Sequence, residues 1–201
     1  PLVDALVADG VRDVVLSGMG GSSLFPLVLT GVAPPAPGHP RLHVLDSTDP
    51  DAVARVEDGI DWSTATLVVA SKSGGTVETL AHLDRLLPAL TAACEDPARR
   101  VVAITDPGSP LEERARAEGF HTVAGDPDVG GRYSALSPFG LAPAALLGVD
   151  VPAMLSWART AAARWAADPW DDAGAAGERG AGSGGGPAHL ATLMACGVEA
   201  G

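Results

Sequence analysis

The sequence predicts an α/β domain in which a five-stranded parallel sheet is the middle layer of a three-layer αβα sandwich. Short apolar runs alternate with helical patterns along the first 125 residues or so, which is typical of a parallel sheet covered by helices. These runs are apolar throughout, as expected for strands that are buried on both faces. In a doubly wound domain of this kind, ligands bind at the carboxyl ends of the strands.

The apolar runs and the patterns between them place the individual elements. Strands are expected at Asp13–Ser17, Leu42–Asp46, Thr66–Ala70, Val101–Thr105 and Phe120–Ala124. Helices are expected at Ser22–Thr30, Asp51–Val56, Val77–Ala93 and Pro110–Glu118. In the helix that begins at Val77, apolar residues recur every three or four positions, which would leave Glu78, His82 and Arg85 on the other faces.

The composition of the chain changes after about Gly148. Helices are expected at Val151–Ala167 and Ala188–Glu199, and the glycine-rich stretch between them resembles a flexible linker. We therefore expect one domain at residues 1–150 and a helical connection at residues 151–201, with residues 168–187 mobile. Because the sequence lacks an initiator methionine and position 1 falls at the start of an apparent helix, we expect it to be part of a longer protein.

Net charge and composition exclude several classes of partner. A net charge of −12 argues against nucleic acid and against an anionic membrane, which both need a basic face. No apolar run approaches the roughly 18–20 residues that span a bilayer, and the N-terminus does not resemble a signal peptide. Neither Cys94 and Cys196 nor the histidines have metal-ligand spacing, so we expect a cytoplasmic protein without a bound metal.

A first glycine-rich loop follows the first expected strand. It has the sequence GMGGSS from Gly18 to Ser23, and its glycines would let backbone N–H groups approach a ligand at the start of a helix. A dinucleotide fingerprint is not present, because Ser23 replaces its third glycine. A tight turn between strand and helix explains this loop equally well.

A second loop, with the sequence SKSGGT from Ser71 to Thr76, follows the third expected strand. It contains three hydroxyl groups, and its Lys72 is the single lysine among 13 basic residues. We expect these hydroxyls, this ammonium and the free N–H groups of a helix start to converge on a phosphate. The alternative, a helix capped by Thr76, accounts for Thr76 but not for Ser71 and Ser73.

A third loop has the sequence GGRYS, from Gly130 to Ser134. The two glycines would let the backbone and the Arg132 guanidinium face the same small volume, where a permanent positive charge could stabilise an oxyanion. The alternative is a surface turn with a solvated arginine. Glu78 could be a partner for Arg132 or only a carboxylate on a helix face.

Taken together, the three loops resemble those of the phosphoglucose isomerase family, which has the sugar-isomerase (SIS), flavodoxin-like fold. The matching segments are GMGGSS, SKSGGTVET and GGRYSALS, in the family's order. The sequences of the first and third segments are most similar to the branch of the family in which the isomerase is fused behind a transaldolase. The resemblance therefore implies a transaldolase domain before Pro1.

The resemblance also implies a function and a role for individual residues. The activity would be the interconversion of glucose 6-phosphate and fructose 6-phosphate through a cis-enediol, without metal or organic cofactor, in a homodimer. The substrate-binding residues would be Gly21, Ser22, Ser71, Lys72 through its backbone, Ser73, Thr76 and Gly131. Arg132 would be the catalytic residue, since it would stabilise the enediolate.

The resemblance places the remaining catalytic groups after Gly201. These are a glutamate general base, a ring-opening histidine and a further lysine, the last two in a second SIS domain, so we expect the 201-residue chain alone to be inactive. Two other functions stay open: a non-catalytic SIS domain that senses a sugar phosphate, and an isomerase of mannose or aminosugar phosphates.

Overall fold

The structure of the protein is a computed structural model that describes residues 2–167. Its strands are β1 (Asp13–Gly18), β2 (Arg41–Leu45), β3 (Ala65–Ala70), β4 (Val101–Thr105) and β5 (His121–Ala124). All of them are parallel, and their order across the sheet is β2-β1-β3-β4-β5. The five strands expected from the sequence are confirmed.

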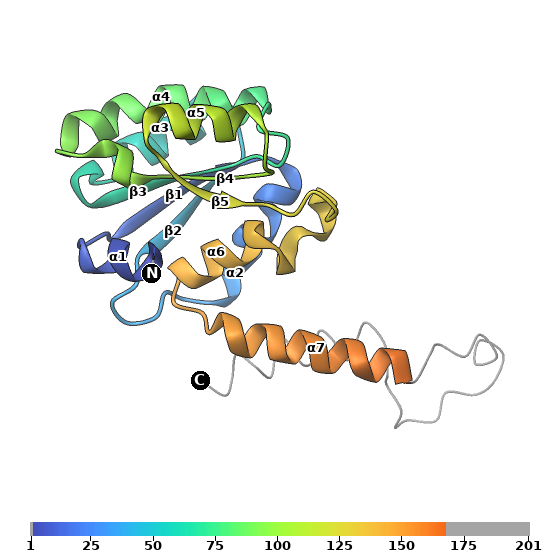
Figure 1. The fold of residues 1–201 in the computed structure, drawn as a ribbon. Coiled ribbons are helices and arrows are strands. Elements are labelled where there is room, and N and C mark those ends of the chain that lie inside the picture. The colour runs from blue at the N-terminus through green and yellow to red at the C-terminus, as the bar shows by residue number, and fades with distance from the viewer. Residues whose placement is uncertain (1, 168–201) are drawn as a thin grey trace. The chain divides into compact units, whose positions relative to one another are not determined.

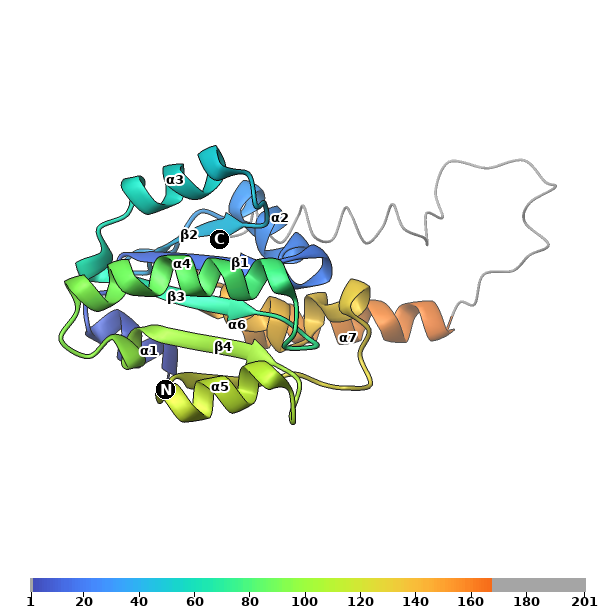
Figure 2. The ribbon, with the colours of Figure 1, turned by 90° about the horizontal axis from the view of Figure 1, so that it is seen from above.

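Helices cover both faces of this sheet (Figure 1). The helices α3 (Pro50–Gly59), α4 (Val77–Ala93) and α5 (Pro110–Glu118) lie on one face, and α1 (Leu2–Ala8), α2 (Leu24–Val32) and α6 (Pro138–Leu146) lie on the other. Seen from above, α3, α4 and α5 follow one another across the strands (Figure 2). The predicted three-layer αβα sandwich is therefore confirmed.

The main hydrophobic core lies between the sheet and the layer that contains α4. Every residue of β1, β3 and β4 is buried, which explains why these strands are apolar on both faces instead of alternating. From α4, Leu83, Leu86 and Leu90 enter this core at helical spacing and are fully buried. Each such leucine contributes about 1.5–3 kcal/mol of burial free energy, so the α4 face holds this layer to the sheet.

The remaining differences from the sequence prediction have local causes. The helix α6 was not predicted, because Pro138 and Pro143 both argue against a helix; Pro138 is tolerated in the first turn, after the cap Ser137. The helix α2 begins two residues later than expected, since Gly20–Ser22 forms a separate 3-10 turn. Burial in the edge strand β5 alternates, which made its apolar pattern weaker.

The chain divides after Val149 into two compact units. The described part of the second unit is α7 (Val151–Ala167), which has the bounds expected from the sequence. The expected helix at Ala188–Glu199 and the stretch at residues 168–187 lie outside the described residues. Within residues 2–167, no helix is both long and apolar enough to span a membrane.

A buried carboxylate joins the two strands at one side of the sheet. Asp13, at the start of β1, accepts a hydrogen bond of 3.0 Å from Arg41 Nη2 and lies 2.7 Å from His43 Nε2. Burial raises the pKa of Asp13, but the hydrogen bonds and charges of Arg41 and His43 outweigh burial, so this pKa lies below 3.8. Asp13 therefore stabilises the fold as a carboxylate above pH 3.8, and this contribution is lost as the pH falls through its folded-state pKa.

We expect the variant Asp13→Asn to be less stable than the wild type by about 1–3 kcal/mol at pH 7, because it leaves two donors without their charged partner. The difference should shrink in strong acid, where the wild-type carboxyl group is itself protonated. Urea unfolding of both proteins at pH 7, 5 and 3 measures this difference. A difference that is equal at all three pH values would contradict the role given to Asp13.

Candidate functional site

The three loops singled out from the sequence lie at the carboxyl edge of the sheet, where the chain direction across the sheet reverses. The strands β1 and β3 are neighbours, and Gly18 pairs with Ala70 at their ends. From there, β1 leads to α2 on one face, whereas β3 leads to α4 on the opposite face. Such a switch point leaves a crevice outside the strand ends, which is the preferred ligand site of open α/β sheets.

The loop Ser71–Thr76 presents hydroxyl groups at the start of α4. Ser71 is buried, and its hydroxyl lies 2.9 Å from the hydroxyl of Thr76. Thr76 occupies the N-cap position of α4, yet its side chain makes no capping hydrogen bond. Thr76 therefore stands at the cap position that the alternative interpretation gave it, but its hydroxyl does not cap the helix. The first N–H groups of α4 receive no cap from Thr76, so an anion could take that place.

The backbone of this loop depends on Gly74. Its φ is +67°, a conformation that side chains disfavour. A Cβ at this position would also lie 2.6 Å from Ser109 Oγ and 2.8 Å from Leu111 N. Ser73 is exposed, and its hydroxyl accepts a hydrogen bond of 3.3 Å from Gly75 N–H. The loop therefore curls tightly against the start of α5, with Ser73 on its outer side.

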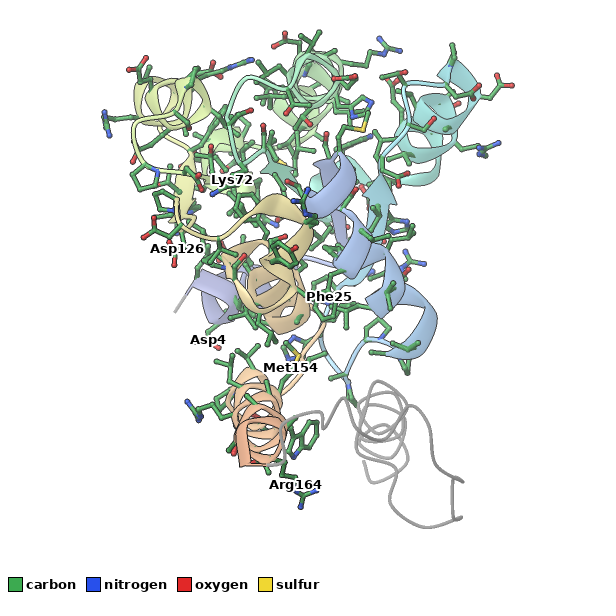
Figure 3. The ribbon with its side chains drawn as sticks, turned by 90° about the vertical axis from the view of Figure 1, so that its right-hand side faces the viewer. Asp4, Phe25, Lys72, Asp126, Met154 and Arg164 are labelled. Carbon is green, nitrogen blue, oxygen red and sulfur yellow. The ribbon has the colours of Figure 1, made fainter. Side chains whose placement is uncertain are left out.

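The contacts of the Lys72 ammonium differ from those expected from the sequence. It lies 2.5 Å from Asp106 Oδ2 and donates to the carbonyl oxygens of Asp126, at 2.8 Å, and Pro127, at 3.3 Å. Figure 3 labels Lys72 and Asp126, whose backbone carbonyl oxygen accepts this hydrogen bond, on the same side of the domain. In this structure the ammonium does not join the hydroxyls of the second loop, because carboxylate and carbonyl oxygens already use its three donors. Its expected part in phosphate binding stays a prediction. A role through the Lys72 backbone is unaffected.

The first and third loops pack directly against each other, although 110 residues separate Gly21 from Gly131. A Cβ on Gly21 would overlap the carbonyl group of Gly131. Ser134 Oγ lies 2.9 Å from the carbonyl oxygen of Gly21 and 2.6 Å from that of Gly131, so its hydroxyl links both loops. Ser22, in the same contact region, is buried. The structure thus brings Gly21, Ser22 and Gly131 together.

Arg132 extends from this contact into solvent. Its guanidinium carbon lies 5.4 Å from the centre of the Tyr133 ring, and both residues are exposed. Among residues 2–167, Arg132 forms no ion pair, with Glu78 or with any other carboxylate. An arginine without a carboxylate partner keeps its charge and its donors for an anionic ligand.

A polar cluster lies under the loops, and the sequence analysis missed it. His82 was expected on an outer face of α4 but is only 3% exposed, and its Nδ1 lies 2.9 Å from the hydroxyl of Ser17. Ser17, at the end of β1, gives the imidazole a polar partner inside the sandwich, which is why burial is tolerated. Burial lowers the pKa of His82, against smaller opposing effects from the Ser47 backbone and Glu78, so His82 is neutral at pH 7.

A hollow between β2 and α3 is the alternative place for a ligand on the described chain. It is lined by residues that include Asp46, Ser47 and Arg55, but by none from the loops that follow β3 and β5. It therefore lacks the hydroxyls of the second loop and the arginine of the third. No group of three or more histidine, cysteine, aspartate or glutamate residues that could hold a metal ion occurs within residues 2–167.

Fold and loops together define a doubly wound α/β domain with a candidate ligand site at the switch point of its sheet, and comparisons with known proteins give its family. A model of the phosphoglucose isomerase family matches residues 5–170. The chain therefore belongs to the phosphoglucose isomerase family.

Individual relatives agree with this assignment. The glucose-6-phosphate isomerases of Rubrobacter xylanophilus and Thermus thermophilus are 39% and 42% identical to the chain, over 75% of it and over 37% and 36% of their own lengths. The chain thus spans little more than a third of these curated relatives.

Two solved structures resemble the chain in fold and in sequence. The crystal structure of hypothetical protein TT0462 from Thermus thermophilus has a TM-score of 0.73 at 38% identity, covering 81% of this chain and 40% of that one. A glucose-6-phosphate isomerase from Chlamydia trachomatis has a TM-score of 0.66 at 28% identity, covering 81% and 31%.

Proposed function

We propose that this chain supplies the sugar-phosphate-binding half of a glucose-6-phosphate isomerase. The observation that carries the proposal is the meeting of three loops at one switch point. The hydroxyl pair of Ser71 and Thr76 lies there at a helix start that the Thr76 side chain does not cap. Gly21 packs on Gly131 beside Arg132, which forms no ion pair among the described residues 2–167. A phosphate needs many donors in a small volume, and an enediolate needs a fixed positive charge; this edge of the sheet offers both.

The residues would divide the substrate between them. Ser71, Ser73, Thr76 and the backbone of Lys72 hold the phosphate, as free N–H and O–H groups at a helix start do in anion sites. Gly21 and Ser22 line the sugar, where the absence of a side chain on Gly21 lets the first loop approach the third.

Arg132, with the backbone of Gly131, would stabilise the reacting atoms. Removal of the C2 proton from the open-chain aldose forms a cis-enediolate, and return of a proton at C1 gives the ketose. The negative charge develops on the two sugar oxygens, and the Arg132 guanidinium, which forms no ion pair within residues 2–167, lowers the energy of that intermediate. No metal or organic cofactor is needed, because the sugar carbonyl already acidifies the neighbouring C–H bond.

The proton-transferring base is a group other than the site residues named above. We propose that it belongs to the part of the relatives' length that this chain does not span, together with the ring-opening histidine and a further lysine. The 201-residue chain alone would then bind sugar phosphates without converting them. For the full-length protein we propose a cytoplasmic homodimer; the transaldolase domain before Pro1 stays a prediction.

Ligand binding to the 201-residue chain tests this proposal. By calorimetry, 6-phosphogluconate should bind, and gluconate, which lacks the phosphate, should not. The carboxylate of 6-phosphogluconate stands in for the enediolate. Arg132→Gln should therefore lower the affinity for 6-phosphogluconate about tenfold and leave the affinity for inorganic phosphate unchanged. Arg85→Gln, a control at an exposed arginine that pairs with Glu57, should change neither affinity.

The same titrations decide between the alternatives. If Arg132→Gln leaves the 6-phosphogluconate affinity unchanged, a non-catalytic sensor of sugar phosphates is the better account. If mannose 6-phosphate or glucosamine 6-phosphate binds far more tightly than glucose 6-phosphate, the isomerase acts on that sugar instead. If no phosphate ester binds, the proposed function is wrong.

A further inference from the structure

The ammonium of Lys72 connects three loops that follow three different strands. Lys72 itself follows β3, Asp106 follows β4, and the carbonyl oxygens of Asp126 and Pro127 lie in the loop after β5. An ammonium has three N–H donors, and these three contacts use all of them. The only lysine of the chain therefore ties the phosphate loop to the segment that leads to Gly131 and Arg132.

The surroundings are built to keep this contact in place. The backbone N–H of Asp106 donates to the Lys72 carbonyl oxygen at 3.2 Å, which fixes the two residues side by side. The side chains of Lys72 and Asp106 are 26% and 19% exposed, so their charges are mostly withdrawn from water. A Cβ on Gly125 would overlap Asp106 Oδ1, which means that glycine at 125 makes room for this carboxylate.

The far end of the contact is a turn that orients the third loop. Asp126 accepts hydrogen bonds from Asp128 N–H, at 3.0 Å on its side chain, and from Val129 N–H, at 3.1 Å on its carbonyl oxygen. That carbonyl oxygen is also the one that Lys72 holds. The turn ends at Gly130, immediately before Gly131 and Arg132. Without the ammonium, the segment from Asp126 to Gly131 would keep only its own internal hydrogen bonds and those at its two ends.

We propose that the side chains of Lys72 and Asp106 form a positioning pair, which sets the third loop, and with it Arg132, relative to the phosphate loop without either side chain contacting the phosphate. The proposal rests on the proposed function in assigning Arg132 to the sugar end of the ligand. It separates two ways in which a lone lysine in a phosphate loop can act. As a phosphate ligand it would affect every phosphate-containing compound, whereas as a positioning residue it affects only ligands that also reach Arg132.

The test uses Lys72→Met, Asp106→Asn and the double variant of the 201-residue chain, with Asp84→Asn as control. Asp84 forms an ion pair with Arg114 on the outer helices, so the control removes a comparable charge at a distance from the loops. Amide hydrogen exchange without ligand is measured first, and protected amides of Leu83 and Leu86 in the core show that each variant is folded. Affinities for inorganic phosphate and 6-phosphogluconate are then measured by calorimetry.

We expect Lys72→Met and Asp106→Asn each to raise the exchange rates of the Asp128 and Val129 amides about tenfold. Each variant should also lower the affinity for 6-phosphogluconate about tenfold and leave the affinity for inorganic phosphate unchanged. The exchange rates and the 6-phosphogluconate affinity of the double variant should equal those of the single variants, because each single variant already removes the same contact. Asp84→Asn should match the wild type throughout.

Two results would overturn the positioning pair. One is unchanged exchange at Asp128 and Val129 in both single variants. The other is a loss of inorganic phosphate affinity in Lys72→Met but not in Asp106→Asn, which would make the ammonium a direct phosphate ligand. If the wild type binds neither compound, the proposed function fails, and the exchange rates alone then decide whether the pair positions the loop.

Discussion

Replacing Gly21 with alanine is expected to separate the first loop from the third and to abolish measurable binding of 6-phosphogluconate. The added Cβ would lie on the carbonyl group of Gly131 and 3.0 Å from Arg132 N, so backbone would have to move on one side or the other. Overpacking of this kind costs about 1–3 kcal/mol of stability. A shift of about 1 Å in a ligand-binding group can cost about a hundredfold in function, so the effect on binding should exceed the effect on folding.

Gly31→Ala is the matched control for this experiment. Gly31 lies within α2, and a Cβ there would meet no atom within 4 Å. Alanine inside a helix stabilises it by about 0.5–1 kcal/mol relative to glycine, so this variant should bind normally and unfold at a slightly higher temperature. Normal 6-phosphogluconate affinity in Gly21→Ala would contradict the claim that the packing of Gly21 on Gly131 forms the sugar side of the site.

The second large effect is expected for Thr76→Val, which keeps the shape of the side chain and removes its hydroxyl. Among the described residues, the Thr76 hydroxyl makes no capping hydrogen bond and pairs only with Ser71 Oγ, so its loss should spare α4 and weaken phosphate binding. A charge-assisted hydrogen bond contributes about 1.5–3 kcal/mol, which corresponds to about a ten- to hundredfold loss of affinity. Calorimetry with 6-phosphogluconate and with inorganic phosphate should give the same factor for both.

Thr91→Val provides the control, because the Thr91 hydroxyl donates to the Leu87 carbonyl oxygen on the exposed part of α4, away from the loops. It should bind both ligands like the wild type. Ser73→Ala is a weaker probe than Thr76→Val, since Ser73 Oγ also accepts a hydrogen bond within the loop. If Thr76→Val and Ser73→Ala both fold and both keep full affinity, the phosphate lies elsewhere.

Much of the fold could be predicted from the sequence because the central strands are buried on both faces. Residues such as Val15, Leu67 and Ile104 stand in short apolar runs that are typical of a parallel sheet. The helix α6 could not be predicted in the same way. Pro143 lies in its interior, and packing overrides the local preference: Gly140 lies so close to Phe25 of α2 that a Cβ would be 2.7 Å from Phe25 Cδ1.

The loops of the candidate site could be found from composition and order, but not the directions of their side chains. A lone lysine among hydroxyls suggests a phosphate ligand, yet the Asp106 carboxylate draws its ammonium to the neighbouring strand end. Asp106 directly follows β4, the neighbour of β3, so a paired acid at this strand end was the signal available in the sequence. For His82, helical spacing gave no sign that Ser17 would hold it inside the sandwich.

A crystal structure of the chain with 6-phosphogluconate tests the central claim most directly, namely that the three loops form one sugar-phosphate site. The phosphate is expected within hydrogen-bonding distance of the Ser71 and Thr76 hydroxyls and of backbone N–H groups at the start of α4, with the Lys72 ammonium still on Asp106. The carboxylate end should lie against Gly131 and Arg132. A phosphate bound instead in the hollow between β2 and α3, or a ligand that touches only one of the loops, would contradict the account.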